Sequence, residues 1–192
     1  MRWLWRGIGL LAAVVVLAVL AGVFVVRSQW FFDYVKTRIV EEARRATGGQ
    51  VEMERFSFDW TTLQARVDGF TLRGKEAAAD APLVRVGSVT LGLKVISIFE
   101  RSVDLRSLNV QSPAVNIIIY PDGTNNFPGP DEGTRKLWSD QLLNLKIGAY
   151  DIAGGVLTYN NRKVPFEAHG ENLRVNMDYD AAGPAYRGEF SS

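Results

Sequence analysis

The chain contains no cysteine and only one histidine, His169, among its 192 residues. The absence of cysteine excludes disulfides, zinc–thiolate sites, a thiol nucleophile and a lipid-modified cysteine. The net charge is only +1, and a nucleic-acid-binding protein needs a basic stripe that neutralises phosphates. The composition therefore predicts a protein without a nucleic-acid partner.

Recognisable catalytic and ligand-binding motifs are also absent. No nucleophile motif surrounds His169, so we interpret it as an ordinary sheet or loop residue. The pairs Gly48-Gly49 and Gly154-Gly155 lack the spacing of a phosphate-binding loop. The segment 122–126 resembles part of a calcium loop but lacks its alternating ligands and distal glutamate, so a turn is favoured. We predict that the protein is not an enzyme and binds no cofactor or metal.

The longest stretch without a charge is the 20-residue segment from Gly7 to Val26. At about 1.5 Å per residue, this segment matches the roughly 30 Å hydrocarbon core of a bilayer. Aromatic residues flank it at Trp3 and Trp5 and again at 30–32, as at membrane interfaces. We predict a single transmembrane helix within an anchor at 1–28. A cleaved signal peptide is the alternative.

Lysine and arginine residues lie on both sides of this segment, and more of them follow it than precede it. That count alone favours a cytoplasmic location for the rest of the chain. Long domains, however, cross membranes with little regard to charge. Charge therefore does not fix the orientation, and we expect the remainder of the chain on the outer side.

Residues 29–49 have the pattern of an amphipathic helix followed by a glycine cap. Apolar residues recur at steps of three and four from Phe32 to Ala46, and Gly48-Gly49 then ends the helix. Such a helix either lies on a membrane surface or covers the open end of a sheet, and its mixed charges favour the second reading.

From residue 50 onward the apolar residues recur with a period of two, as in β-strands. A short unit recurs along this region. It has two alternating apolar residues, then two residues that break the alternation (a slip), then two more alternating apolar residues. Val84 and Val86 followed by Val89 and Leu91 are one example. We interpret the slips as β-bulges, with tight turns as the alternative. The predicted fold is mainly β: an N-terminal transmembrane helix, an amphipathic helix, and a twisted, curled, largely antiparallel sheet of about nine strands over 50–192.

The sequence offers no comparable set of helices to cover the apolar side of this sheet. Either two sheets close on each other as a sandwich, or one sheet curls and leaves an apolar groove that binds a ligand. The candidate groove residues are the alternating apolar side chains of the first strands: Val51, Met53, Phe56, Phe58, Val67, Phe70, Leu72, Val84, Val86, Val89, Leu91, Leu105, Leu108, Val110, Val115, Ile117 and Ile119.

Residues 102–127 combine a strand, Ser112-Pro113, a second apolar strand and the loop residues Asp122, Gly123 and Asn126. With the N-terminal segments and residues 145–177, this arrangement resembles the AsmA-like superfamily, which includes the TamB translocation-and-assembly proteins. Asn125 is the alternative to Asn126 as the asparagine of this loop pattern. The resemblance covers essentially the whole chain and suggests the N-terminal portion of a longer protein.

The resemblance implies a β-groove domain in the bacterial periplasm, attached to the inner membrane by a single span. It implies that phospholipid acyl chains lie in the groove and are carried between inner and outer membrane, or that the protein assists outer-membrane protein assembly and secretion. An Omp85-type outer-membrane barrel is the implied partner. The alternative is a membrane-tethered β-sandwich that binds a partner protein and carries no lipid.

Overall fold

The computed structural model describes residues 28–94, 105–129, 147–180 and 185–192. The chain divides into two compact units, Met1–Arg38 and Ile39–Ser192. The predicted span from Gly7 to Val26 lies outside the described residues.

The described helix, α2 (Gln29–Thr47), begins and ends at residues suited to capping. The Phe31 N–H donates hydrogen bonds to the Ser28 hydroxyl at 3.3 Å and to the Ser28 carbonyl at 3.1 Å, so Ser28 caps the first turn. At the other end, Gly48 adopts the left-handed φ of 69°, and its N–H donates to the Arg44 carbonyl at 2.8 Å. The helix therefore ends at the glycine predicted to cap it.

The predicted fold class, with a transmembrane helix and an amphipathic helix ahead of the sheet, is not supported by the structure. The described residues contain one helix, and its charged residues leave it too polar to cross a bilayer. No residue of α2 is fully buried, but the apolar residues of the predicted face are half-buried: Phe32, Val35, Ile39, Ala43 and Ala46.

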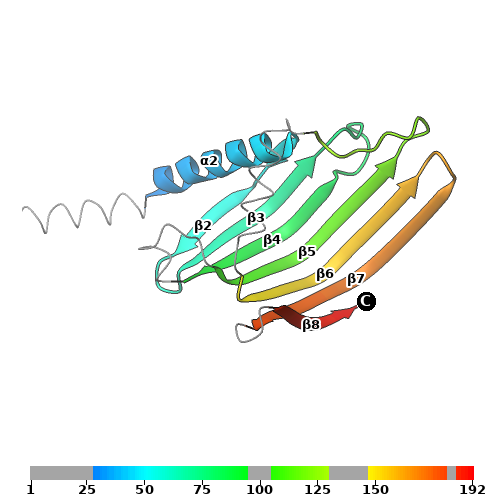
Figure 1. The fold of residues 1–192 in the computed structure, drawn as a ribbon. Helices are drawn as coiled ribbons and strands as arrows, with labels where there is room; N and C mark the ends of the chain where they lie inside the picture. The colour runs from blue at the N-terminus through cyan, green and yellow to red at the C-terminus, as the bar shows by residue number, and fades with distance from the viewer. Residues whose placement is uncertain (1–27, 95–104, 130–146, 181–184) are drawn as a thin grey trace, which may run out of the picture. The chain divides into compact units, whose positions relative to one another are not determined.

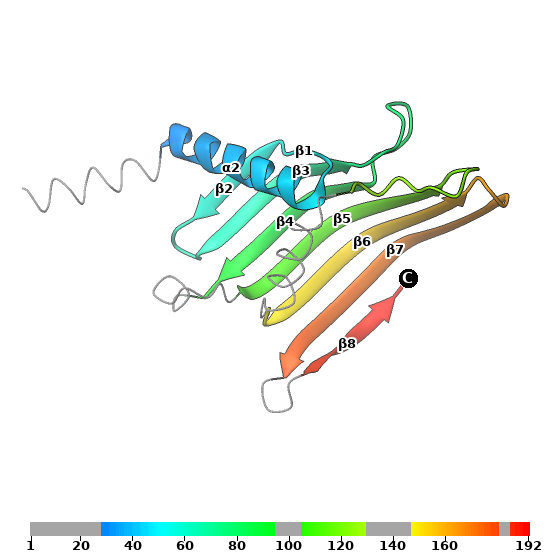
Figure 2. The ribbon, with the colours of Figure 1, turned by 45° about the horizontal axis from the view of Figure 1, so that its top comes forward.

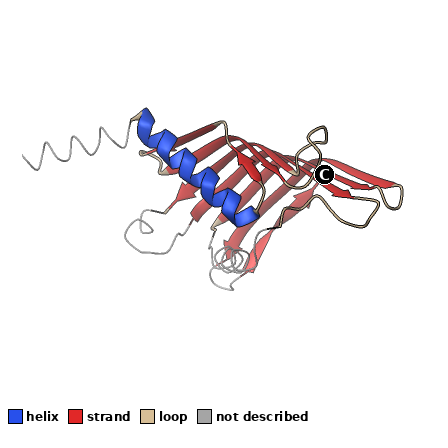
Figure 3. Ribbon diagram, turned by 90° about the horizontal axis from the view of Figure 1, so that it is seen from above, coloured by secondary structure: helices blue, strands red, loops and turns tan. Residues whose placement is uncertain are grey.

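The strands of the unit Ile39–Ser192 form one open sheet in the order β1-β3-β4-β5-β6-β7-β8, with β2 also paired to β3. Figures 1 and 2 show these strands side by side, and Figure 3 shows them as one layer. The bounds are β1 (Gln50–Glu52), β2 (Arg55–Asp59), β3 (Gln64–Arg73), β4 (Val84–Leu93), β5 (Leu105–Ile119), β6 (Ala149–Asn161), β7 (Phe166–Asp180) and β8 (Ala185–Ser191).

Six of the seven strand pairings are antiparallel, and β5 and β6 pair in parallel. A parallel pairing needs a crossover, because the chain must return to the starting end of β5 before β6 begins. The described strands thus form a single sheet rather than the two facing sheets of the sandwich alternative.

The slip between Val67 and Phe70 coincides with Gly69, which belongs to a line of left-handed residues across the sheet. Gly69, Ser112 and Gly154 have left-handed φ values of 64°, 51° and 66°. Gly69 lies between the pairs Asp68↔Ser88 and Phe70↔Val86, and the register on its two sides is the same. The predicted bulges are therefore wrong for β3 and β4, because neither strand gains a residue relative to the other.

A true register shift does occur between Gly92 and Leu93, opposite the segment from Leu105 to Ser107. This shift coincides with the slip predicted between Leu105 and Leu108, so the bulge interpretation holds there.

Few apolar side chains are fully buried, because a single open layer leaves both of its faces near solvent. The buried apolar residues among those described are Val51, Met53, Leu83, Val86, Leu105, Ile118 and Ile147. Most other apolar side chains of the sheet are half-buried, and the largest exposed ones include Phe166 and Phe190.

Candidate functional site

A continuous row of apolar side chains crosses seven strands of the sheet. Directly paired residues lie on the same face, so the register identifies the members of the row. We call this set the central apolar row, and it consists of Phe56, Val67, Val89, Val110, Ile152, Val175 and Phe190.

A second apolar row lies two residues along each strand and therefore on the same face. Its members are Phe58, Ala65, Leu91, Leu108, Tyr150, Met177 and Gly188. The row between these two points to the opposite face and contains only polar or charged residues. It consists of Ser57, Arg66, Thr90, Asn109, Asp151, Asn176 and Glu189. This part of the sheet thus has one apolar face and one polar face.

On the other side of Gly69, Ser112 and Gly154, more of the predicted groove residues are paired across the strands. Val51, Leu72, Val84 and Val115 form one row, which Leu157 continues on β6. Phe70 pairs with Val86. Ile117 pairs with Tyr159, Ile119 with Asn161, and Leu105 with Leu93. The register therefore groups the scattered sequence candidates into a few shared rows.

Burial divides the predicted groove residues into two groups. Val51, Met53, Val86 and Leu105 are buried, with exposed fractions of 0–7%. The remaining candidates are half-buried, and none is fully exposed. The buried four belong to the core, whereas the half-buried residues retain surface that a ligand can cover.

Sequence reasoning missed the contribution of β6, β7 and β8 to these rows. Ile152, Val175 and Phe190 occupy the same central row as Val110, and Tyr150 and Met177 occupy the second. The same two-residue period was present in these strands. Their membership in the row depends on the parallel pairing of β5 with β6, which the pattern along the chain does not show.

Tyrosines cluster where the second apolar row crosses β6 and β8. The rings of Tyr150 and Tyr186 meet edge to face with centroids 5.2 Å apart, and Tyr179 lies 5.3 Å from Tyr186. Burial raises the pKa of the Tyr150 hydroxyl, and its hydrogen bond with Tyr186 raises it further. The Tyr150 phenol therefore stays neutral at physiological pH and extends the uncharged face.

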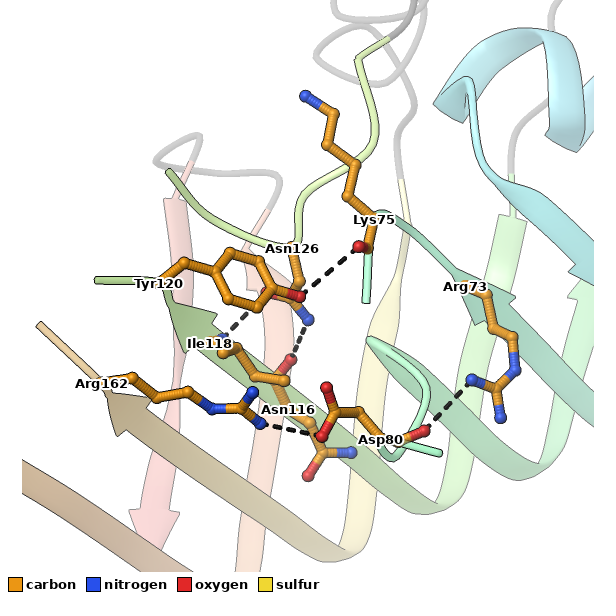
Figure 4. Close-up of polar contacts among 8 residues, drawn as sticks. All are labelled: Arg73, Lys75, Asp80, Asn116, Ile118, Tyr120, Asn126 and Arg162. Carbon is orange, nitrogen blue, oxygen red and sulfur yellow. Dashed lines mark hydrogen bonds and ion pairs between the residues drawn. The ribbon is translucent and has the colours of Figure 1, made fainter. Parts of the chain in front are cut away.

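The loop residues singled out by the family resemblance have structural roles. Asn126 is fully buried, its Oδ1 accepts the Ile118 N–H at 2.9 Å, and its Nδ2 donates to the Asn116 carbonyl at 2.8 Å (Figure 4). Because β4 begins at Val84, paired with Val115, these β5 groups have no partner from β4. Asn126 thus replaces a missing strand, whereas Asn125 is exposed.

Asp122 and Gly123 form the turn that precedes Asn126. The Asp122 carboxylate accepts hydrogen bonds from the Thr124 hydroxyl at 2.7 Å and the Thr124 N–H at 2.9 Å. These bonds lower the pKa of Asp122 below its usual value of 3.8, the hydroxyl contributing most. Gly123 has a left-handed φ of 87°, which explains a glycine at this position.

Polar contacts attach the neighbouring loops to the sheet (Figure 4). Arg162 forms an ion pair of 2.8 Å with Asp80, and its guanidinium lies 5.7 Å from the centre of the Tyr120 ring. The Arg73 guanidinium donates to the Asp80 carbonyl at 3.2 Å. These contacts link the ends of β3, β5 and β6.

His169 has a partner that sequence reasoning missed. Its Nδ1 lies 3.1 Å from the Thr158 hydroxyl, and its Nε2 lies 2.9 Å from a Glu171 carboxylate oxygen. Thr158 is 11 positions away in sequence and meets His169 only through the β6–β7 pairing. The cluster is solvent-exposed, and no group of three metal-binding side chains occurs in the described part of the chain. The prediction of no enzymatic activity stays a prediction.

The most extensive arrangement for binding is thus the half-buried apolar face defined by the register. No model of a known protein family matches the chain, and a search of curated proteins likewise gives no match.

Proposed function

We propose that the apolar face of the sheet binds the acyl chains of phospholipids and carries lipid between the membranes of the cell envelope. One observation supports this proposal above the others. Seven consecutive strands place apolar side chains in the central row, while the adjacent row on the opposite face is wholly polar. A folded sheet rarely keeps so large an apolar area half-exposed unless a ligand or partner covers it.

The dimensions of the central apolar row suit an acyl chain. Neighbouring strands lie about 4.8 Å apart, so the six steps from Phe56 to Phe190 span roughly 29 Å. A bilayer core of about 30 Å contains two layers of acyl chains, so one chain needs about half of that length. The row is therefore long enough for one chain, with space for a second.

The expected affinity comes from burial rather than from specific contacts. Each CH₂ group transferred from water contributes about 0.8 kcal/mol. Aliphatic and aromatic side chains without directional groups do not distinguish one acyl chain from another. We therefore expect binding that is firm but tolerant of chain length and headgroup.

Irregular residues separate the central row from the row of Leu72, Val84 and Val115. In a regular strand, residues an odd number of positions apart, such as Val67 and Phe70, face opposite sides. The left-handed residue Gly69 interrupts that alternation. We infer that the interruption returns the second set of apolar residues to the lipid-binding face.

Two adjacent residues of β5 provide a matched test. Val110 belongs to the central apolar row, and Asn109 belongs to the polar row on the other face. A photo-reactive amino acid at Val110 of the full chain in its native membrane should crosslink to phospholipid, whereas the same group at Asn109 should not. Lipid adducts at neither position, or equally at both, would refute the proposal.

A substitution at the same pair separates lipid binding from folding. Val110→Asp should abolish the lipid that co-purifies with the chain, because a carboxylate on this face opposes burial of an acyl chain. Asn109→Asp adds the same charge to the polar face and should leave the bound lipid unchanged. Circular dichroism would show whether both variants keep the sheet.

Four further expectations stay predictions from the family resemblance. They are the inner-membrane location, the periplasmic placement of the sheet, the role in outer-membrane protein assembly and the Omp85-type partner. Cleavage of the β region by protease added after the outer membrane is permeabilised, with the inner membrane left intact, would support the placement, whereas continued protection would contradict it.

A further inference from the structure

The turn between β6 and β7 presents apolar side chains to solvent in a fixed shape. Val164 is 62% exposed and Phe166 is 58% exposed. The Asn161 Oδ1 accepts hydrogen bonds of 3.0 Å from both the Lys163 N–H and the Val164 N–H. These bonds and the restricted backbone of Pro165 shape the turn before any partner arrives.

We propose that this turn inserts into the surface of a phospholipid bilayer and brings the apolar face to the membrane. This inference rests on the proposed function, because it identifies the surface from which the acyl chains would come. An apolar pair that is already ordered loses little conformational entropy on insertion, which favours a bilayer contact.

An apolar path connects the turn to the sheet face. Phe166 pairs with Asn161, and its ring lies 6.2 Å from the Tyr159 ring. Leu157, two residues before Tyr159, is 41% exposed and continues the row of Val84 and Val115. Residues 157, 159 and 161 share one face of β6 because of the two-residue period. Acyl chains moving from the bilayer to the sheet would therefore stay in contact with apolar side chains.

The charges near the turn match a phospholipid headgroup region. Lys163 directly precedes Val164, where its ammonium group would meet lipid phosphates. Asp122 is the acidic group that interacts with Lys163. Arg162 is held by its ion pair with Asp80. The positive and negative groups roughly balance, so apolar insertion rather than net charge would drive the contact.

The absence of cysteine makes a site-specific test straightforward. Val164→Cys would carry an environment-sensitive dye, and the full chain would be reconstituted with phosphatidylcholine vesicles whose acyl chains are brominated. Trp60→Cys is the matched control: it is 42% exposed and lies in the turn after β2, at the other end of β3. Dye at position 164 should be quenched severalfold more strongly than dye at position 60.

A second variant tests the apolar contribution directly. Adding Phe166→Ser to the labelled chain should lower the quenched fraction about tenfold, because a largely exposed aromatic side chain no longer enters the bilayer. Equal quenching at positions 60 and 164, or unchanged quenching after Phe166→Ser, would overturn the inference.

Failure of this inference differs measurably from failure of the proposed function. Lipid adducts at Val110 without quenching at position 164 would refute membrane insertion by the turn and leave acyl-chain binding intact. Quenching at position 164 without adducts at Val110 would refute acyl-chain binding and support a membrane contact alone.

Discussion

Replacement of Asn126 by alanine should be among the most destabilising changes in the described sheet. The side chain is fully buried and serves two backbone groups of β5, the Ile118 N–H and the Asn116 carbonyl. Alanine leaves both without a partner in a site that β4 does not reach. A buried group that loses its partner costs about 1–3 kcal/mol, so the expected total for the two groups is about 2–6 kcal/mol.

Asn125→Ala is the matched control, because it removes the same side chain one position away. Asn125 is exposed, and its Oδ1 accepts one hydrogen bond of 3.0 Å from the Phe127 N–H. Loss of this surface bond should change the free energy of unfolding by about 0.5 kcal/mol or less.

Urea unfolding of the full chain, followed by circular dichroism, measures the difference. With a typical denaturant dependence of about 1–3 kcal/mol per molar urea, Asn126→Ala should lower the midpoint by roughly 1–3 M. Asn126→Asp should also destabilise at neutral pH, because it places a carboxylate oxygen against the Asn116 carbonyl. Equal midpoints for the Asn126 and Asn125 alanine variants would refute the view that Asn126 substitutes for a strand.

Three further predictions concern backbone strain, titration and an ion pair. Ser112→Gly should raise the free energy of unfolding by about 1 kcal/mol, measured by thermal unfolding, because serine holds a left-handed φ of 51° there. Thr124→Val should raise the pKa of Asp122 toward 3.8, measured by NMR titration, since the hydroxyl that stabilises the carboxylate is lost. With its pKa lowered in the fold, Asp122 stabilises the turn above its unfolded pKa and loses that contribution as pH falls through the folded value. A double-mutant cycle between Arg162 and Asp80 should give a coupling of about 1 kcal/mol or less, because the pair is partly exposed.

The two-residue period predicted a mainly β chain and the apolar members of the first five strands, because burial on one face forces that alternation. It did not predict that Val110 shares a row with Ile152 and Phe190, since register between strands depends on pairings distant in sequence. It also did not predict the contact between Thr158 and His169, which the β6–β7 register creates.

The apolar period of α2 predicted its bounds but not its surroundings. Helix formation depends on local sequence and caps, which Ser28 and Gly48 supply. Burial depends on what packs against the helix, and no residue of α2 is fully buried. The prediction of bulges in β3 and β4 was wrong because a pattern along one strand does not show its register with the neighbouring strand, and that register is unchanged across Gly69.

The left-handed residues Gly69, Ser112 and Gly154 lie in one line across the sheet, and we call this line the crease. Gly69 interrupts β3 and Ser112 interrupts β5, and β4 lies between these two strands. Since neither interruption changes the register with β4, a residue inserted into one strand near them would misalign every apolar row beyond that point. Strand length on each side of the crease is therefore constrained jointly across the sheet. Related chains should accept insertions in the turns and tolerate them within these strands only when adjacent strands change together.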